Sequence, residues 1–274
     1  MERIRRNERL AAMTHILQDA PNQIFTLSRF CEQFGTAKST MSEDIDILRE
    51  VFDRYAIGIL ETVAGASGGV RYRPALTGKL ARKAVTLLSE RLSAPGRVLP
   101  GGFLYLADVL CAPGTMEQMA RILAAQFYDT DPDFIVTVGT QGIPLAMMTA
   151  RTMNLPLVIA RNDIRVYEGP AVHINYMASS GGIKIMALSR RSVREGQRAL
   201  IIDDFVKGGG TVRGMVELMR EFSVSVVGTG VLLATREPAK RQIERMRALM
   251  VMDDVDGERL SARVRPSEWV GGEA

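Results

Sequence analysis

Two neighbouring carboxylates followed by a run of glycines form the part of this sequence best suited to chemistry. Asp203 and Asp204 come after the apolar run 199–202, and the stretch Lys207 to Thr211 holds three successive glycines. Neighbouring carboxylates can accept hydrogen bonds from sugar hydroxyls or hold a magnesium ion. Successive glycines let backbone N–H groups converge on one anion, and a helix that begins at Thr211 adds its positive end. The pattern therefore predicts a site for a ribose phosphate.

A second candidate loop, Gly139-Thr140-Gln141-Gly142, follows another apolar run at 134–138. Apolar runs that alternate with helical stretches imply a parallel sheet covered on both faces, and such sheets bind ligands beyond the carboxyl ends of their strands. We therefore expect the two loops at one edge of a sheet. The expected strands are 134–138, 155–160, 199–202 and 224–233, and the expected helices are 115–127, 144–153, 211–222 and a charged one at 236–247.

The N-terminal segment carries three helical patterns and then a hairpin. Helices are expected at 9–17, 27–34 and 40–52, and strands at 58–63 and 69–73. Thr26 is the expected N-cap of the second helix and Gly35 its end, while Ser39 or its neighbour is expected to cap the third. Three helices followed by a hairpin predict a winged helix-turn-helix, whose recognition helix can enter the major groove of DNA.

Residues placed to touch DNA gather at three places in this segment. They are Arg5 and Arg6 on the N-terminal arm, Lys38, Ser39, Thr40 and Ser42 at the start of the recognition helix, and Arg71 and Arg73 on the wing. Residues 1–73 contain ten basic and ten acidic side chains, so the placement of charge favours DNA and its sum does not. The alternative is a helix-turn-helix unit used for dimerisation or docking.

Length and composition favour two globular domains. The chain has 274 residues, of which 46% are hydrophobic and 24% charged. We expect a DNA-binding domain at 1–73 and a larger domain at 74–274, with a connecting helix at 76–92 that carries a basic stripe. No window is apolar enough for a transmembrane helix, and the charged N-terminus is not that of a signal peptide. We therefore expect a cytoplasmic protein with no membrane partner.

The sequence offers no metal-binding or disulfide pattern. Cys31 and Cys111 are too few and too far apart for a disulfide framework or a zinc site, and both are expected in the core. His15 and His173 stand without ligand partners at metal spacing. We therefore expect no structural metal.

Taken together, the apolar strand, the two acids and the glycine run resemble the signature loop of type I phosphoribosyltransferases, which bind 5-phosphoribosyl-1-diphosphate. The resemblance implies that Asp203 and Asp204 engage the ribose hydroxyls, that the loop from Lys207 holds the 5-phosphate, and that Thr140, Gln141 and Gly142 hold the diphosphate. Where transferases place alanine-threonine or a proton-handling aspartate, this chain has Lys207-Gly208. A lysine there adds positive charge and removes a candidate general base, so we expect binding without catalysis.

The order of the two domains resembles the bacterial purine operon repressor family, and the stretches 37–44, 99–102, 168–169 and 174–176 fit it too. The resemblance implies an α/β protein, with a winged helix-turn-helix domain before a type I phosphoribosyltransferase-like parallel-sheet domain. We expect a homodimer on double-stranded operator DNA, because paired recognition helices need paired half-sites, and we expect no required cofactor. Phosphoribosyl diphosphate, alone or with magnesium, is the implied effector, and guanosine tetraphosphate is a second nucleotide for the same pocket. The alternative is a purine phosphoribosyltransferase with an N-terminal docking domain.

Further groups are candidates for the pocket wall. Phe103 and Tyr105 are expected to stack on a base or line the pocket, with a place in the core as the alternative. The polar stretch 161–182 resembles the flap that covers the ligand in transferases. Arg161 and Lys184 could reach a diphosphate, with solvated surface charge as the alternative for either residue. The predicted ligand-binding residues are Phe103, Tyr105, Thr140, Gln141, Gly142, Arg161, Asp203, Asp204, Phe205, Lys207, Gly208, Gly209, Gly210 and Thr211.

Overall fold

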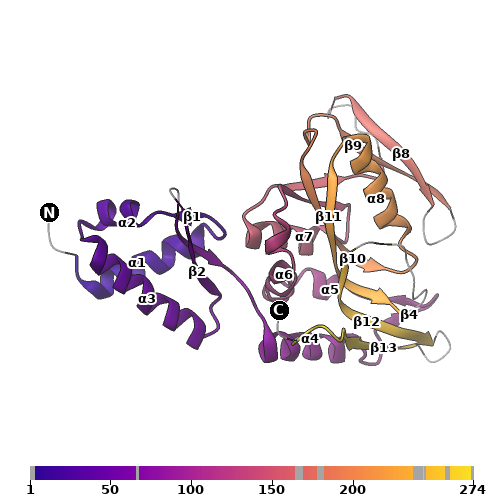
Figure 1. Cartoon of the computed structure of the whole chain (residues 1–274). Coiled ribbons are helices and arrows are strands. Elements are labelled where there is room, and N and C mark those ends of the chain that lie inside the picture. The colour runs from indigo at the N-terminus through magenta and orange to yellow at the C-terminus, as the bar shows by residue number, and fades with distance from the viewer. Residues whose placement is uncertain are drawn as a thin grey trace. The chain divides into compact units, whose positions relative to one another are not determined.

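The computed structural model describes residues 4–65, 68–163, 169–177, 182–236, 243, 245–256 and 260–272 (Figure 1). The chain forms two compact units. One comprises Met1–Leu76 together with Arg151–Asn154, and the other comprises Thr77–Ala150 together with Leu155–Ala274. Each unit has its own buried apolar core.

The first unit is a helical domain closed by a small sheet. Its elements are α1 (Arg6–Asp19), β1 (Ile24–Phe25), α2 (Leu27–Phe34), α3 (Lys38–Arg54), β2 (Ile59–Val63) and β3 (Gly69–Arg73). The three strands pair antiparallel in the order β1-β3-β2. The helices and the β2–β3 hairpin follow the winged helix-turn-helix prediction, and β1 is a strand that the sequence pattern missed.

The ends of the two central helices show why they stop and start where they do. Thr26 caps α2 by accepting a hydrogen bond from the Arg29 backbone N–H, and Gly35 ends it with a φ of 58°. The prediction that Ser39 or its neighbour caps the next helix by its side chain is wrong. Helix α3 begins at Lys38 with Ala37 as its N-cap and no side-chain cap, which leaves the Ser39 side chain exposed.

Aromatic and aliphatic side chains fill the core of this unit. Phe25 stacks on Phe30 with ring centroids 5.5 Å apart, and Phe52 meets Tyr72 edge-on at 5.3 Å. The Tyr72 hydroxyl donates a hydrogen bond to the Ile57 carbonyl, which satisfies the polar end of a buried ring. This core fixes α3 against the β2–β3 hairpin.

The second unit is built on a six-stranded sheet with the order β13-β12-β11-β10-β6-β7. Neighbours are parallel except for β12 and β13, which pair antiparallel. The sheet strands are β6 (Phe134–Val138), β7 (Leu157–Ala160), β10 (Arg198–Val206), β11 (Ser225–Thr235), β12 (Met246–Asp256) and β13 (Ser261–Pro266). The parallel-sheet domain predicted from the sequence is confirmed.

Helices cover this sheet. They are α4 (Gly78–Leu92), α5 (Ala107–Leu110), α6 (Pro113–Ala125), α7 (Ile143–Met153) and α8 (Gly210–Glu221), with a 3-10 turn at Tyr128–Thr130. Helices α4 and α6 pack on the β11 to β13 side of the sheet, and α8 packs on β6, β10 and β11. Two short hairpins complete the unit, β4 (Val98–Leu99) with β5 (Phe103–Leu104) and β8 (Ala171–Met177) with β9 (Ile183–Ser189).

Strand β8 lies within the stretch predicted as a flap, β9 begins just after it, and the β8–β9 hairpin packs on α8 (Figure 1). A Cβ added to Gly214 of α8 would lie 2.9 Å from the Tyr176 ring, so glycine is what lets helix and hairpin approach so closely. Residues 164–168 and 178–181 of the stretch lie outside the described residues. Residues 171–177 of the stretch are therefore paired strand rather than irregular loop.

Three further sequence predictions need correction. Strand β10 continues through Asp203 and Asp204 to Val206, so the two acids stand in the strand and the loop begins at Lys207. The helix predicted at 236–247 is wrong at its end, because β12 begins at Met246; residues 237–242 and 244 lie outside the described part of the chain. Cys111 is exposed rather than in the core, and Cys31 is half-buried.

Candidate functional site

The two acids stand at the carboxyl end of β10, a central strand of the sheet, and both are buried. An Asp203 carboxylate oxygen accepts a hydrogen bond from the Asp204 backbone N–H at 3.0 Å. Burial raises the pKa of the Asp203 carboxyl well above its ordinary value, and the neighbouring Asp204 raises it further. Burial also raises the pKa of Asp204. Two carboxyl groups are thus held where water solvates them poorly, which suits groups that await a hydrogen-bonding partner.

The loop after β6 lies directly against the first of these acids. A Cβ added to Gly142 would lie 2.5 Å from the Thr137 hydroxyl oxygen and 2.8 Å from an Asp203 carboxylate oxygen. Only a glycine fits here. The Thr137 hydroxyl is buried without a hydrogen-bond partner among the described residues. The structure therefore brings together Gly142 and Asp203, which are far apart in the sequence.

The glycine-rich loop turns the chain from β10 into α8. Gly209 has a φ of 78°, a left-handed conformation that favours glycine, and α8 begins at Gly210. Arg213 donates a hydrogen bond to the Gly208 carbonyl, and the Thr235 hydroxyl donates to the Lys207 carbonyl. These bonds fix the loop from its carbonyl side. The first N–H groups of α8 have no partner within the helix, so they are available to an anion.

A cavity of ≈ 680 Å³ opens beside this loop. It is lined by Gly101, Gly102, Phe103, Leu104, Leu106, Gln141, Asp204, Phe205, Lys207, Thr235, Met252, Asp253 and Val255. Phe103 is 70% exposed, so it is a wall of the cavity and not a core residue. An exposed phenyl ring beside an open cavity is suited to stack on a planar base.

Nine of the fourteen predicted residues are not among those that line this cavity, namely Tyr105, Thr140, Gly142, Arg161, Asp203, Gly208, Gly209, Gly210 and Thr211. The Tyr105 ring faces the Arg97 guanidinium, whose carbon lies 6.0 Å from the ring centroid. Arg161 exchanges backbone hydrogen bonds with Ala187 of β9. Neither is among the lining residues, and Lys184 is exposed on the β8–β9 hairpin.

The sequence reasoning missed the wall that β12 provides. Met252, Asp253 and Val255 line the cavity, and both oxygens of the Asp253 carboxylate accept from the Arg265 Nε–H of β13. These residues were overlooked because the chain before β12 was interpreted as a helix. The continuous apolar run Ala248–Met252 was the available signal, since it fits a buried parallel strand that ends at the same edge as β10.

The candidate DNA-binding residues fall into exposed and ion-paired groups. Lys38, Ser39 and Ser42 are exposed at the start of α3, Thr40 is half-buried beside them, and Arg5 is exposed just before α1. Arg6 pairs with Glu43 and the fully buried Asp44, each at 2.7 Å.

The wing arginines are also paired. Glu61 on β2 contacts both Arg71 and Arg73 on β3. Arg6, Arg71 and Arg73 therefore hold carboxylate partners in the folded chain, and their contact with DNA stays a prediction.

No helix among the described residues is long and apolar enough to cross a membrane. In the same part of the chain, no group of three or more histidine, cysteine, aspartate or glutamate side chains is placed to hold a metal ion.

The chain combines a winged helix with a parallel-sheet domain that carries two adjacent aspartates and a glycine-rich loop. These features define the class of DNA-binding proteins with a phosphoribosyltransferase-type domain. The model of the N-terminal domain of the bacterial purine repressor matches residues 5–74, and the phosphoribosyl transferase domain model matches residues 112–256. The chain belongs to the bacterial purine repressor family. It is therefore a transcription regulator.

Individual relatives support the same placement. The purine biosynthesis transcriptional repressor PurR of Bacillus subtilis (strain 168) is 38% identical over 98% of this chain and 94% of its own length. The purine biosynthesis transcriptional activator PurR of Lactococcus lactis subsp. lactis (strain IL1403) is 36% identical over 92% of this chain and 94% of its own. The solved adenine phosphoribosyltransferase of Thermoanaerobacter pseudethanolicus aligns with a TM-score of 0.52 and 18% identity, over 60% of this chain and 98% of that one. The last likeness concerns the fold alone.

Proposed function

We propose that this chain regulates transcription of purine biosynthesis genes by sensing phosphoribosyl diphosphate without reacting it. Residues 1–73 bind double-stranded operator DNA, residues 74–274 bind the effector, and two copies act together in the bacterial cytoplasm. The observation that carries the proposal is the contact of Gly142 with the buried Asp203, because it joins the loops predicted for the diphosphate and the ribose into one site.

Each part of the effector has a matching group in this site. The ribose hydroxyls donate to Asp203 and Asp204, and the 5-phosphate receives N–H groups from Gly208 to Thr211. The diphosphate lies against Thr140, Gln141 and Gly142, with Lys207 adding positive charge. Magnesium would enter with the diphosphate, because Mg²⁺ is commonly held by one or two carboxylates together with ligand phosphates and waters.

The cavity beside the loop has room for more than a sugar phosphate. Its ≈ 680 Å³ and its two phenylalanines, Phe103 and Phe205, suit a nucleotide base. Guanosine tetraphosphate is therefore the second proposed effector, with its guanine among these groups and a diphosphate at the loops. Two ligands that share one pocket would exclude each other while favouring different states of the protein.

The rival function is a purine phosphoribosyltransferase whose N-terminal unit only docks. The fold permits this function, but the loop does not favour it, because Lys207 and Gly208 supply no group to manage the proton of an attacking base. Incubation with phosphoribosyl diphosphate and each purine base distinguishes the two. Nucleotide formation at ordinary enzyme rates, about 1 to 1000 per second, would establish the enzyme.

A gel-shift titration with operator DNA tests the regulator. We expect phosphoribosyl diphosphate to release wild-type protein from the duplex, and Asp204→Asn to bind the duplex equally well but to ignore the ligand. Calorimetry should show that the wild type binds both effectors. The affinity of Asp204→Asn for phosphoribosyl diphosphate should be at least tenfold lower than that of the wild type. Asp129→Asn, which changes the same residue type away from the site, is the matched control. Ligand-independent DNA binding by the wild type would end the proposal.

A further inference from the structure

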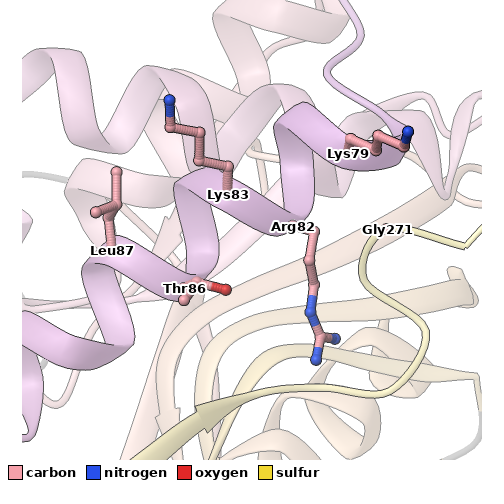
Figure 2. A pocket seen from close by; sticks show the side chains of 6 residues that line it. All are labelled: Lys79, Arg82, Lys83, Thr86, Leu87 and Gly271. Carbon is pink, nitrogen blue, oxygen red and sulfur yellow. The ribbon is translucent and has the colours of Figure 1, made fainter.

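Helix α4, the first element of the second unit, carries three basic side chains in its first two turns. Lys79, Arg82 and Lys83 line a shallow cavity of ≈ 380 Å³ together with Thr86, Leu87 and Gly271 (Figure 2). The next acidic residue along the helix is Glu90. This part of α4 is therefore a strongly positive surface without a local counter-charge on its own helix.

The three basic residues are used differently. Arg82 runs toward the C-terminal segment, where its guanidinium donates to the Ser267 and Val270 carbonyls at 3.1 and 3.2 Å (Figure 2). A Cβ on Gly271 would lie 2.7 Å from the Arg82 Cβ, so the segment packs closely on the stem of this arginine. Lys79 and Lys83 are exposed and have no ion pair or hydrogen bond with any residue that the structure describes. Arg82 is thus structural, and the two lysines are left for a partner.

The position of these charges on the helix is unfavourable for stability. Cations near the N-terminus of a helix oppose its dipole, typically by a few tenths of a kcal/mol each. The N-cap residue Thr77 does not offset this, because its side chain makes no capping hydrogen bond. Residues that lower the stability of their own helix, and that form no ion pair or hydrogen bond within the described part of the chain, are more readily explained by binding than by folding.

The covalent chain limits what this surface can reach. Lys79 stands six positions after Arg73, the end of the wing strand β3. An extended chain of that length spans at most about 20 Å. Duplex DNA carries one charge per about 1.7 Å of its axis. Any duplex bound at Arg73 therefore has several phosphates within about 20 Å of Arg73, which is the longest distance at which Lys79 can lie from it.

We propose that Lys79 and Lys83 bind phosphates of the DNA duplex, so that α4 extends the DNA contact of the winged helix into the second unit. This inference rests on the proposed function, because it requires the chain to bind DNA. Phosphate contacts carry no direct sequence information, so this surface adds affinity for every duplex and leaves the choice of operator to the first unit.

The test compares full-length variants by fluorescence anisotropy on operator and unrelated duplexes of equal length between 50 and 200 mM salt. Lys79→Gln/Lys83→Gln should lower the affinity for both duplexes by the same factor, about fivefold for each lost contact at 0.15 M salt. The slope of log affinity against log salt concentration should become shallower by about 0.9 for each lost contact. Lys79→Arg/Lys83→Arg should bind as the wild type. The melting temperature of the glutamine variant should be unchanged or slightly higher, since the helix dipole is relieved.

The matched control is Arg190→Gln/Arg191→Gln, which removes the same charge from two exposed residues at the end of β9. It should bind DNA as the wild type. The inference is overturned if the α4 variant keeps its affinity and salt slope, or if both double variants weaken alike, because bulk charge would then explain the loss. A change in oligomeric state of the α4 variant in sedimentation would also overturn it, by making Leu87 and the lysines a contact between copies. Failure of the wild type to bind any operator would instead remove the proposed function itself.

Discussion

Asp203 is a residue whose burial opposes the stability of the free protein. Its pKa is raised mainly because burial disfavours its charge, so the folded protein holds this proton more tightly than the unfolded chain does. The destabilisation is fully present above the folded pKa and is relieved as the pH falls through it. The carboxylate is nevertheless suited to receive ribose hydroxyls, which suggests that stability is sacrificed for binding at this position.

Asp203→Asn should therefore stabilise the free protein at pH 7.5, by about 1 kcal/mol or about 2 to 4 °C in melting temperature. The difference from the wild type should shrink as the pH is lowered, because the wild-type carboxyl then becomes neutral too. Affinity for phosphoribosyl diphosphate should fall at least tenfold. Calorimetry and thermal melts across pH provide the measurement, and a variant less stable than the wild type at every pH would contradict this account.

Phe103 is expected to contribute to the binding of only one of the two proposed effectors. Its ring is 70% exposed, so Phe103→Ala should change the stability by no more than about 0.5 kcal/mol. Guanosine tetraphosphate has a base to stack and should lose about tenfold in affinity, whereas phosphoribosyl diphosphate has none and should bind as before. Leu99→Ala, at an exposed apolar position on the paired strand β4, is the control. Equal losses for both ligands would show that Phe103 shapes the pocket as a whole.

At the scale of elements, the wing hairpin holds its own arginines. Glu61 on β2 contacts Arg71 and Arg73 on β3. If the wing binds phosphates, Glu61 competes with DNA for these guanidinium groups. Glu61→Gln should then raise the affinity for any duplex by about fivefold and steepen the salt slope by about 0.9 for each freed arginine.

Glu32→Gln, an equal charge change at an exposed position on α2, should have a smaller effect. Weaker DNA binding by Glu61→Gln would show that the pairs maintain the shape of the hairpin and are not released to phosphates. The same anisotropy titration measures both variants.

The Asp108 carboxylate on helix α5 links this helix to two neighbouring segments by hydrogen bonds. Asp108 accepts hydrogen bonds from Arg97, beside β4, and from Arg91 at the end of α4. The hydrogen bond from Arg97 is the largest cause that lowers the pKa of Asp108, to about 2. A lowered pKa contributes stability that is present above the unfolded value and is lost as the pH falls through the folded one.

Asp108→Asn should cost up to about 1 kcal/mol at pH 7, a modest value because these side chains are partly exposed. The gap between variant and wild type should close between about pH 4 and pH 2. Glu90→Gln, at an exposed position next to Arg91 on α4, is the control and should show no such closing. Urea denaturation at several pH values measures both, and a gap that is constant with pH would rule out the ion pairs as its source.

The strands and helices that carry the two loops were predictable because each has an uninterrupted apolar pattern, as at Phe134–Val138. The end of β10 was not, because two aspartates in succession usually mark a loop, and only tertiary burial keeps them in a strand. Strands β12 and β13 were missed because charged residues precede them and because an antiparallel edge strand has a weak pattern of its own. Asp253 was lost from the predicted site for the same reason.

At the scale of the whole molecule, the sequence predicted the order of units but not their charge pairing. The ion pairs of Arg6, Arg71 and Arg73 depend on strand register and on the packing of α1 against α3, which composition does not reveal. The candidate DNA surface is consequently less positive than a list of its basic residues implies. The unpaired lysines of α4 become correspondingly more important for DNA binding.

Effector and operator must influence each other equally if one protein binds both. Should saturating phosphoribosyl diphosphate weaken operator binding by some factor, saturating operator must weaken effector binding by the same factor. Calorimetry with and without operator duplex checks this equality, and an unrelated duplex should give a smaller effect. Asp204→Asn should lower the effector affinity and keep the operator affinity. A mismatch between the two factors would mean that DNA and ligand are linked through a third equilibrium, such as assembly of the copies.

The fit of Gly142 against Asp203 has a genetic meaning. There is no room for a methyl group at this position, so Gly142→Ala should yield a regulator that folds but no longer binds the nucleotide precursor. If subunits mix, the variant would make the wild-type copies paired with it unresponsive to the effector. Selection for bacteria whose purine genes no longer respond to starvation should therefore recover dominant mutations at this glycine.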